Sequence, residues 1–291
     1  MRKLKNQIIK KLIHAKLTSE ELNLLFWISR RQSADGVAAG LYYRDFMRDT
    51  GASDQAFYNA LKSLEEKGFI RKWKETYSDW TVIIIDNDFS YEAAYQEGYL
   101  NTGLSLFADQ KFYSLKANEK VLLVYMLMLT GAISTKRKNY YRRAASFYKE
   151  CKAVMGITER TLRSYLRTLR LFLHIGEDAE GILYIKPRKA TVVTDRESEN
   201  EVFAQQVTRM ALRRNLIKKI AAGAKQDLIQ VVKNYTPGNE TTICGIFMEA
   251  FRKSIFIRNG DKRDKYKWDR NISVPFIHKL LRQELGLEAT L

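Results

Sequence analysis

Hydrophobic positions in the first ninety residues follow helical spacing three times in succession. Residues 17–31 open with acidic side chains and continue with leucine and isoleucine three and four positions apart, which predicts a helix. The following segment SADGVAAG predicts a loop. A shorter helix is predicted over residues 42–50. A third is predicted from Asp54 to Lys67, before Gly68, which suits the left-handed position after a last turn.

The third predicted helix has one apolar face and is followed by two strands. Ser53 is placed to cap its first turn, and Phe57, Leu61 and Leu64 share one side of it. FIRKWKET and WTVIIID then read as strands on either side of the turn YSD, which predicts a hairpin over residues 69–86. The pattern is therefore three helices followed by a hairpin.

The same order of elements recurs in the second part of the chain. The spacing of Leu17 and Glu21 recurs with a shift of 98 residues, at Leu115 and Glu119. The seven extra residues before the next match fit a longer loop, ISTKRKNYYRRAA, and HIGEDAEGILYIK predicts a second hairpin. The cap and apolar positions of the third helix recur with a shift of 105, at Thr158, Leu162, Leu166 and Leu169.

These patterns predict a mainly α fold with small β-hairpin wings, that is, two winged-helix domains in tandem plus a helical C-terminal domain. The first domain spans residues 1–90 and begins with a basic amphipathic helix. Residues 91–110 are acidic, aromatic and turn-rich, and predict a linker or a small packing helix. The second domain spans residues 111–190. Residues 200–291 predict the helical C-terminal domain.

The net charge of the chain indicates which class of partner it binds. The chain of 291 residues has a net charge of +17 and a pI near 9.7. Residues 111–190 hold 17 Lys and Arg against 6 Asp and Glu, so this segment carries +11 of that charge. Such a surplus favours nucleic acid or an acidic membrane surface as partner. No apolar run approaches the roughly 20 residues of a membrane span, so we expect no membrane partner.

The scattered nucleophiles and metal ligands argue against catalysis. His14, His174 and His278 lie far apart, and the chain has no GxxxxGK[ST] phosphate loop. A nuclease or recombinase set finds no support in the spacing. We therefore expect no enzymatic activity, no cofactor and no metal. Cys151 and Cys244 stand alone, which favours a reducing cytoplasm.

The outward faces of the two third helices carry the candidate DNA contacts. Glutamine and asparagine pair with adenine in the major groove, whereas arginine and lysine suit guanine or phosphate. A solvated basic helix face is the alternative. The first helix offers Ser53, Gln55, Tyr58, Asn59 and Lys62, and the second offers Arg160, Thr161, Arg163, Ser164, Arg167 and Arg170.

A basic loop before the second domain's middle helix is a further candidate. In TKRKNYYRR, two tyrosines stand between clusters of lysine and arginine that suit phosphates. A mobile charged loop is the alternative. The candidate contacts are Lys136, Arg137, Lys138, Arg142 and Arg143. The first hairpin is basic enough to reach phosphate, whereas the tip of the second is acidic.

LTSEELNLLFWI, the short helix before Gly51, and FYNALKSLEEKGFIRKW together resemble the winged-helix DNA-binding superfamily. They are most similar to the helix-turn-helix units of bacterial and phage replication organisers and transcription regulators. The tandem arrangement is similar to plasmid replication initiators built from two winged helices. The resemblance covers residues 17–188, although RLFLHI lacks the glycine that follows the first unit's third helix. It does not extend to residues 200–291.

The resemblance implies a sequence-specific double-stranded DNA-binding protein, the replication initiator of a plasmid or other mobile element. The sequence leaves two alternatives open, a transcriptional repressor with the same fold and a protein-interaction module without DNA binding. Double-stranded DNA is the expected partner, in a bacterial cytoplasm and associated with nucleoid or plasmid. A homodimer, and a replication or transcription partner bound through residues 200–291, also stay open.

Overall fold

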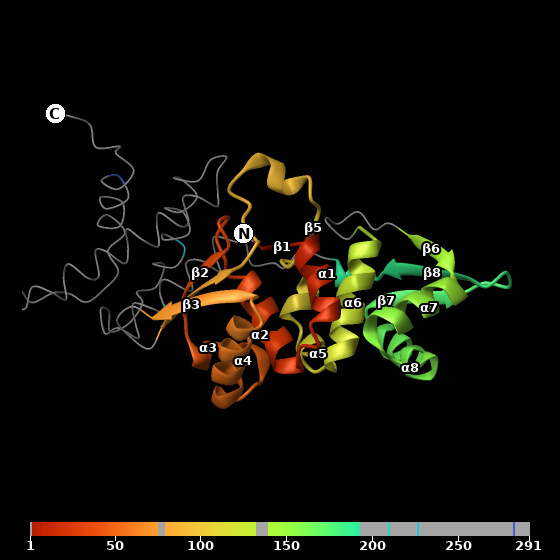
Figure 1. Ribbon diagram of the computed structural model, residues 1–291, viewed down its shortest axis with the longest axis horizontal. Coiled ribbons are helices and arrows are strands. Elements are labelled where there is room, and N and C mark those ends of the chain that lie inside the picture. The colour runs from red at the N-terminus through yellow and green to blue at the C-terminus, as the bar shows by residue number, and fades with distance from the viewer. Residues whose placement is uncertain are drawn as a thin grey trace, which may run out of the picture.

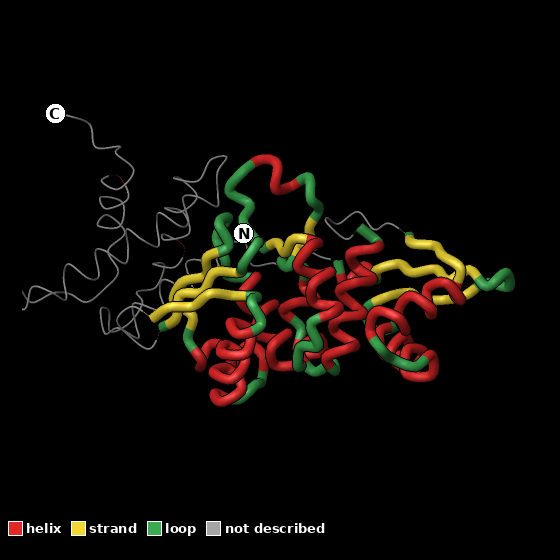
Figure 2. The backbone as a smooth tube through the Cα atoms, in the orientation of Figure 1, coloured by secondary structure: helices red, strands yellow, loops and turns green. Residues whose placement is uncertain are grey.

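Helices and short antiparallel strands alternate along the chain in the computed structural model (Figure 1). The structure describes residues 2–74, 79–131 and 139–192, together with the single residues 209, 226 and 282. Three small sheets are present in these ranges, one of two strands and two of three strands. The tube in Figure 2 shows the two larger sheets toward opposite ends and most helices between and below them. The predicted C-terminal domain, residues 200–291, lies outside the described ranges.

The first unit is built from helix, strand, helix, helix and two further strands. The predicted helices and hairpin are confirmed, but the segment expected to be a loop contains a strand. That strand, β2, pairs with β4 and buries Ala38 and Leu41, so the sheet has the order β2-β4-β3. The elements are α2 (Ser19–Ser29), β2 (Val37–Leu41), α3 (Tyr43–Thr50), α4 (Asp54–Glu66), β3 (Ile70–Lys74) and β4 (Trp80–Ile84).

The second unit repeats this order of elements and of strands. Its sheet has the order β6-β8-β7, the counterpart of β2-β4-β3. Here too a strand, β6, stands where the sequence predicted only a loop, because Tyr140 to Arg143 pair with β8. The elements are α6 (Ala117–Leu129), β6 (Tyr140–Arg143), α7 (Ala144–Met155), α8 (Glu159–Leu169), β7 (Leu173–Glu177) and β8 (Ile182–Pro187).

The turn before each third helix is the same in both units. Gly51 and Gly156 end the preceding helix in the left-handed region, with φ of 76° and 64°. Ser53 and Thr158 then cap α4 and α8, each side chain accepting a backbone N–H at 3.1 and 3.2 Å respectively. Both predicted caps are confirmed. The left-handed glycine and the capping residue together therefore determine where each third helix begins and how its first turn is oriented.

Each third helix buries the apolar face that its spacing predicted. In the first unit, Trp27 of α2 contacts the ring edges of Phe46 and Phe57, with centroids 5.5 and 6.5 Å away. Burial of such side chains stabilises the unit by roughly 25 cal/mol per Å² of apolar surface. The buried positions are Phe57, Leu61 and Leu64 in α4 and Leu162, Leu166 and Leu169 in α8.

The segment predicted to be a linker or a small packing helix is packed into the protein and contains short helical turns. It contains two short 3-10 helices (Glu92–Tyr95 and Ser105–Ala108), β5 (Tyr99–Asn101) and the start of α5 (Gln110–Tyr113). Phe107 is fully buried and stacks on Phe26 of α2, with the ring centroids 5.2 Å apart. The buried side chains of both units and of this segment form one continuous core.

The N-terminal segment joins the second unit. β1 (Lys3–Lys5) pairs with β5, and α1 (Asn6–His14) follows directly. Ile8, Ile9 and Leu12 are buried, which confirms the predicted amphipathic helix. The helix packs against α6 and α7 rather than staying within the first unit. Because Lys11 of α1 also donates to the backbone oxygen of Gly68 in the first unit, at 3.0 Å, α1 contacts both units (Figure 1).

A buried lysine lies at the junction of the units. Lys120 of α6 is fully buried, and its ammonium group donates to Ser19 Oγ at 2.6 Å, to Tyr113 O at 2.9 Å and to Leu115 O. Burial lowers the pKa of Lys120 to about 8, against the opposing attraction of Glu20 and Glu119.

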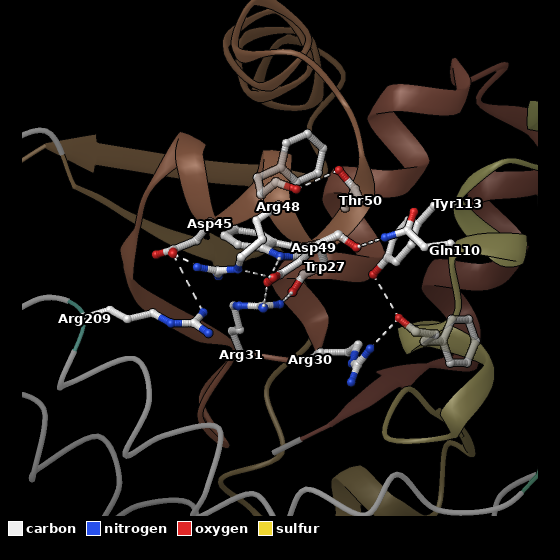
Figure 3. A network of polar contacts seen from close by, with 12 residues as sticks. Trp27, Arg30, Arg31, Asp45, Arg48, Asp49, Thr50, Gln110, Tyr113 and Arg209 are labelled. Atoms are coloured by element: carbon white, nitrogen blue, oxygen red, sulfur yellow. Dashed lines mark hydrogen bonds and ion pairs between the residues drawn. The ribbon is translucent and has the colours of Figure 1, made fainter. Parts of the chain in front are cut away.

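An ion-pair network fixes α3 against α2 (Figure 3). Asp49 accepts from Trp27 Nε1 at 3.1 Å and from Arg31 at 2.6 Å, and its second oxygen accepts from Arg48 at 3.0 Å. Burial lowers the pKa of Arg31 to about 10, although Asp49 opposes that change. The guanidinium of Arg209 lies 3.7 Å from Asp45 in the same network.

Candidate nucleic-acid interface

The outward face of α8 carries most of the predicted basic residues. Leu162, Leu166 and Leu169 turn inward, so the intervening arginines are exposed. In the described part of the chain, Arg160 and Arg167 have no ion-pair partner. Uncompensated guanidinium groups on a helix surface are suited to bind phosphate or the acceptor edge of a base.

Arg163 differs from the neighbouring arginines because its guanidinium already has partners within the protein. Its guanidinium pairs with Glu159 Oε1 at 2.8 Å and lies 5.3 Å from the centre of the Tyr148 ring. The hydrogen bond to Glu159 raises the pKa of Arg163, with a smaller effect from Tyr148. The sequence grouped Arg163 with the free arginines, but the structure places it in a local ion pair.

A polar groove runs between α8 and the second hairpin. Its volume is about 260 Å³, and Arg163, Arg167 and Arg170 line one side. Tyr148 and Glu177 line it as well. Because Arg163 is paired with Glu159, the guanidinium groups of Arg167 and Arg170 set against the carboxylate of Glu177 leave the groove electropositive. It extends the basic surface from α8 toward β7.

The outward face of α4 is polar but less basic. All five predicted residues are exposed. Gln55 Nε2 donates to Asn59 Oδ1 at 2.8 Å, so one amide orients the other. Tyr58 lies beside Tyr43 of α3, with ring centroids 5.8 Å apart. Lys62 lies 3.8 Å from Glu66, a weak surface pair.

The C-terminal end of α4 carries acidic side chains, whereas the C-terminal end of α8 carries basic ones. Glu65 and Glu66 are exposed on the last turn of α4, and Glu65 pairs with Lys72 of β3. The corresponding end of α8 presents Arg167 and Arg170. An anionic partner is therefore attracted more strongly to the outward face of α8 than to that of α4, whose candidate contacts include one basic residue, Lys62.

The two helices match position by position. With the shift of 105 residues, Gln55 corresponds to Arg160, Asn59 to Ser164, and Tyr43 of α3 to Tyr148 of α7. Tyr58 and Lys62 correspond to Arg163 and Arg167 in the same way. The Tyr43–Tyr58 contact in the first unit thus has the Tyr148–Arg163 contact as its counterpart. The scaffold is repeated while the outward chemistry differs.

The remaining predicted contacts are distributed differently. Thr161 is half-buried and its hydroxyl lies 2.9 Å from that of Thr158, so it belongs to the cap of α8. Arg142 lies in strand β6 and pairs with Glu150 of α7, which also accepts from Tyr125. Arg143 is exposed at the start of α7. Lys136, Arg137 and Lys138 lie outside the described residues.

The structure adds exposed groups on the first hairpin that the candidate set did not include. Trp73 of β3 is 40% exposed, and Arg71 and Lys74 beside it are exposed. Lys74 Nζ lies 5.5 Å from the centre of the Trp80 ring. The alternation of basic and aromatic residues in RKWK was the available signal, because it places Arg71 and Trp73 on one face of the strand.

Other kinds of site find less support in the described ranges. No group of three His, Cys, Asp or Glu there could hold a metal ion. No described helix has the length and hydropathy to cross a membrane. Cys151 is buried, and burial, followed by the nearby Glu150, raises the pKa of its thiol to about 12. No protein-family model, curated protein or solved structure matches the chain.

Proposed function

We propose that this chain is a tandem winged-helix protein that binds double-stranded DNA sequence-specifically through α4 and α8. The observation that carries the proposal is the repeated scaffold with a capped third helix whose outward face is polar or basic. In helix-turn-helix proteins that third element lies in the major groove and contacts base edges with its leading residues. Ser53 and Thr158 place the leading turns of α4 and α8 at equivalent positions.

Electrostatics supports DNA over an uncharged partner. Lysine and arginine that neutralise phosphates release counterions, which supplies much of the affinity for DNA. Arg160, Arg167 and Arg170 are exposed on α8, and the first hairpin adds Arg71 and Lys74. These groups provide the phosphate and base contacts in the proposal.

The placement of the helices supports binding of both to one duplex. In the view of Figure 1, α4 and α8 both lie along the lower edge of the molecule, and the two hairpins extend toward opposite ends. Two helices on one edge suit sites on one face of DNA, whose turns repeat about every 10 base pairs. We therefore expect a binding site with two separated half-sites.

The biological role that we propose is replication initiation of a plasmid or other mobile element, in a bacterial cytoplasm. Two unequal units in tandem favour an asymmetric element that is repeated in one direction, as at an origin. A transcriptional repressor with the same fold is the alternative, and it predicts a palindrome at a promoter. The chain acts by binding in either case, without an enzymatic step or a cofactor.

Selection of bound duplexes from a random pool tests the proposal. The wild-type chain should enrich a defined motif, and the double variant Arg160→Ala, Arg167→Ala should bind that motif more weakly at moderate salt. Lys10→Ala with Lys189→Ala is the control, because it removes two exposed positive charges elsewhere. Failure to retain any duplex at low salt would refute DNA binding and favour a protein-interaction module.

A further inference from the structure

Two residues hold equivalent positions on the proposed DNA-binding helices but differ in chemistry. Gln55 and Arg160 each follow the capping residue of their helix by two positions, and both are exposed. We infer that this position determines specificity, so that Gln55 contacts adenine in one half-site and Arg160 contacts guanine in the other. The inference rests on the proposed function and adds the bases that each unit selects.

The surroundings of Gln55 suit adenine. Its amide nitrogen donates one hydrogen to Asn59 Oδ1 at 2.8 Å, which orients the side chain along the helix surface. The carbonyl oxygen and the second N–H of the amide remain for a ligand. Adenine offers a matching donor at N6 and acceptor at N7 in the major groove. Asn59 therefore acts as a positioning residue for Gln55.

The surroundings of Arg160 suit guanine. Its guanidinium has no partner among the described residues, whereas Arg163 is held by Glu159 and Tyr148. A free fork of N–H donors matches O6 and N7 of guanine, which are both acceptors. At the position of Asn59 the second unit has Ser164. That side chain has no amide with which to orient a glutamine, so the helix is adapted to arginine.

The consequence is a binding site without two-fold symmetry. The two units lie in one chain in a fixed order, so their adenine and guanine contacts fall in a fixed order along the DNA. A single chain then occupies an oriented element, and several chains bind as direct repeats. A palindrome would present the same base to both helices in its two halves.

Reciprocal substitution is the direct test. Motifs are selected from a random duplex pool with the full chain, with Gln55→Arg and with Arg160→Gln, and affinities are then measured on the wild-type motif. Gln55→Arg should replace one adenine by guanine, and Arg160→Gln should replace one guanine by adenine in the other half-site. Each variant should bind the wild-type motif about 5- to 150-fold more weakly, the range for one bidentate base contact.

Two further variants separate base readout from charge. Arg160→Lys keeps the charge but loses the fork, so it should retain non-specific affinity and lose part of the preference for guanine. Asn59→Ala should weaken the preference for adenine at the same position without changing non-specific affinity. Thermal unfolding of each variant checks that these exposed substitutions leave the fold intact.

The possible outcomes distinguish a failure of the inference about bases from a failure of the proposed DNA-binding function. A wild-type motif that is unchanged in Gln55→Arg and Arg160→Gln overturns the inference and leaves DNA binding standing. A palindromic wild-type motif overturns it as well. The absence of any wild-type motif overturns the proposed function, and the inference with it.

Discussion

The guanidinium of Arg163 lies 5.3 Å from the centre of the Tyr148 ring, and the same pair of positions in the first unit holds Tyr58 beside Tyr43. In both units an aromatic residue of the second helix contacts an exposed residue in the second turn of the third helix. A cation over an aromatic face and a pair of tilted rings both stabilise such a contact. The geometry of this turn is therefore retained while its charge changes.

The ion pair of Arg163 predicts a measurable change in salt dependence. Glu159→Gln removes the carboxylate that holds this guanidinium, so Arg163 becomes available to phosphate. We expect tighter binding to random duplex DNA and a slope of log K against log salt steeper by about 0.9, the value for one added phosphate contact. Fluorescence anisotropy over a series of salt concentrations measures it.

Glu180→Gln is the control for that experiment, because Glu180 is exposed at the tip of the second hairpin, away from α8. It removes the same charge without releasing a paired arginine. Equal slopes for the two variants would contradict a specific role for the pair of Glu159 and Arg163.

The buried Lys120 predicts a stability that increases with pH. Its folded pKa of about 8 lies below the ordinary 10.5, so between these values the unfolded chain binds a proton that the folded chain does not. Stability then rises with pH, by about 2 kcal/mol between pH 8 and pH 9.5, and no contribution to the slope is expected well below pH 8. Urea unfolding at several pH values measures this rise.

Lys120→Met should flatten that rise, because it removes the buried ammonium group whose pKa is lowered to about 8. It should also lower stability, since the buried carbonyls of Tyr113 and Leu115 each lose one of two donors and keep only Asn23 and Ser19 respectively. Lys116→Met, an exposed lysine at the start of the same helix, should keep the wild-type slope. A wild-type chain whose stability is constant over this range would show that Lys120 retains its ordinary pKa.

The left-handed glycines predict equal effects in the two units. Gly51→Ala and Gly156→Ala place a Cβ on residues with φ of 76° and 64°, where an L-residue costs roughly 1–2 kcal/mol. Neither Cβ would meet an atom closer than 3.7 Å, so strain and not collision sets the effect. Each variant should unfold at lower urea with an unchanged m-value. A neutral effect in one unit alone would mean that its turn relaxes.

Local signals in the sequence were sufficient for the repeated helices and their caps. Ser53 and Thr158 precede apolar positions at helical spacing, and both cap a helix as predicted. Strands β2 and β6 were not predicted, because the first is short and rich in Ala and Gly and the second is dominated by Tyr and Arg. Each becomes a strand through pairing with a distant partner, β4 or β8, which no local pattern encodes.

The candidate site shows the same division between local and distant information. Exposure of Gln55, Asn59 and Arg160 followed from the helical period, and the structure confirms it. Arg142 forms an ion pair with Glu150 because β6 packs beside α7, and the sequence did not predict this packing. The packing of α1 onto α6 likewise depends on contacts over more than a hundred residues.

The buried carboxylate of Glu21 supports the last prediction. Burial alone raises the pKa of Glu21, but hydrogen bonds from Lys67, Ser63 and the Thr18 backbone outweigh it and lower the pKa below its ordinary value. Lys67 Nζ donates to the two oxygens at 2.8 and 2.9 Å. Lys67→Met therefore leaves a buried charge without its cation, and should destabilise the protein by about 3 kcal/mol at pH 7, as for other broken buried pairs.

The interaction between Glu21 and Lys67 also determines whether stability rises or falls on acidification. Because the folded pKa of Glu21 is lowered, its contribution is present above the ordinary value of 4.5 and is lost as the pH falls through the folded pKa. Lys67→Met should reduce that loss on acidification, so the wild-type and variant stabilities converge toward low pH. Lys62→Met is the control, since this exposed lysine lies 3.8 Å from Glu66 and its pair is worth at most about 1 kcal/mol. Similar urea midpoints for the two variants at pH 7 would contradict a special role for Lys67.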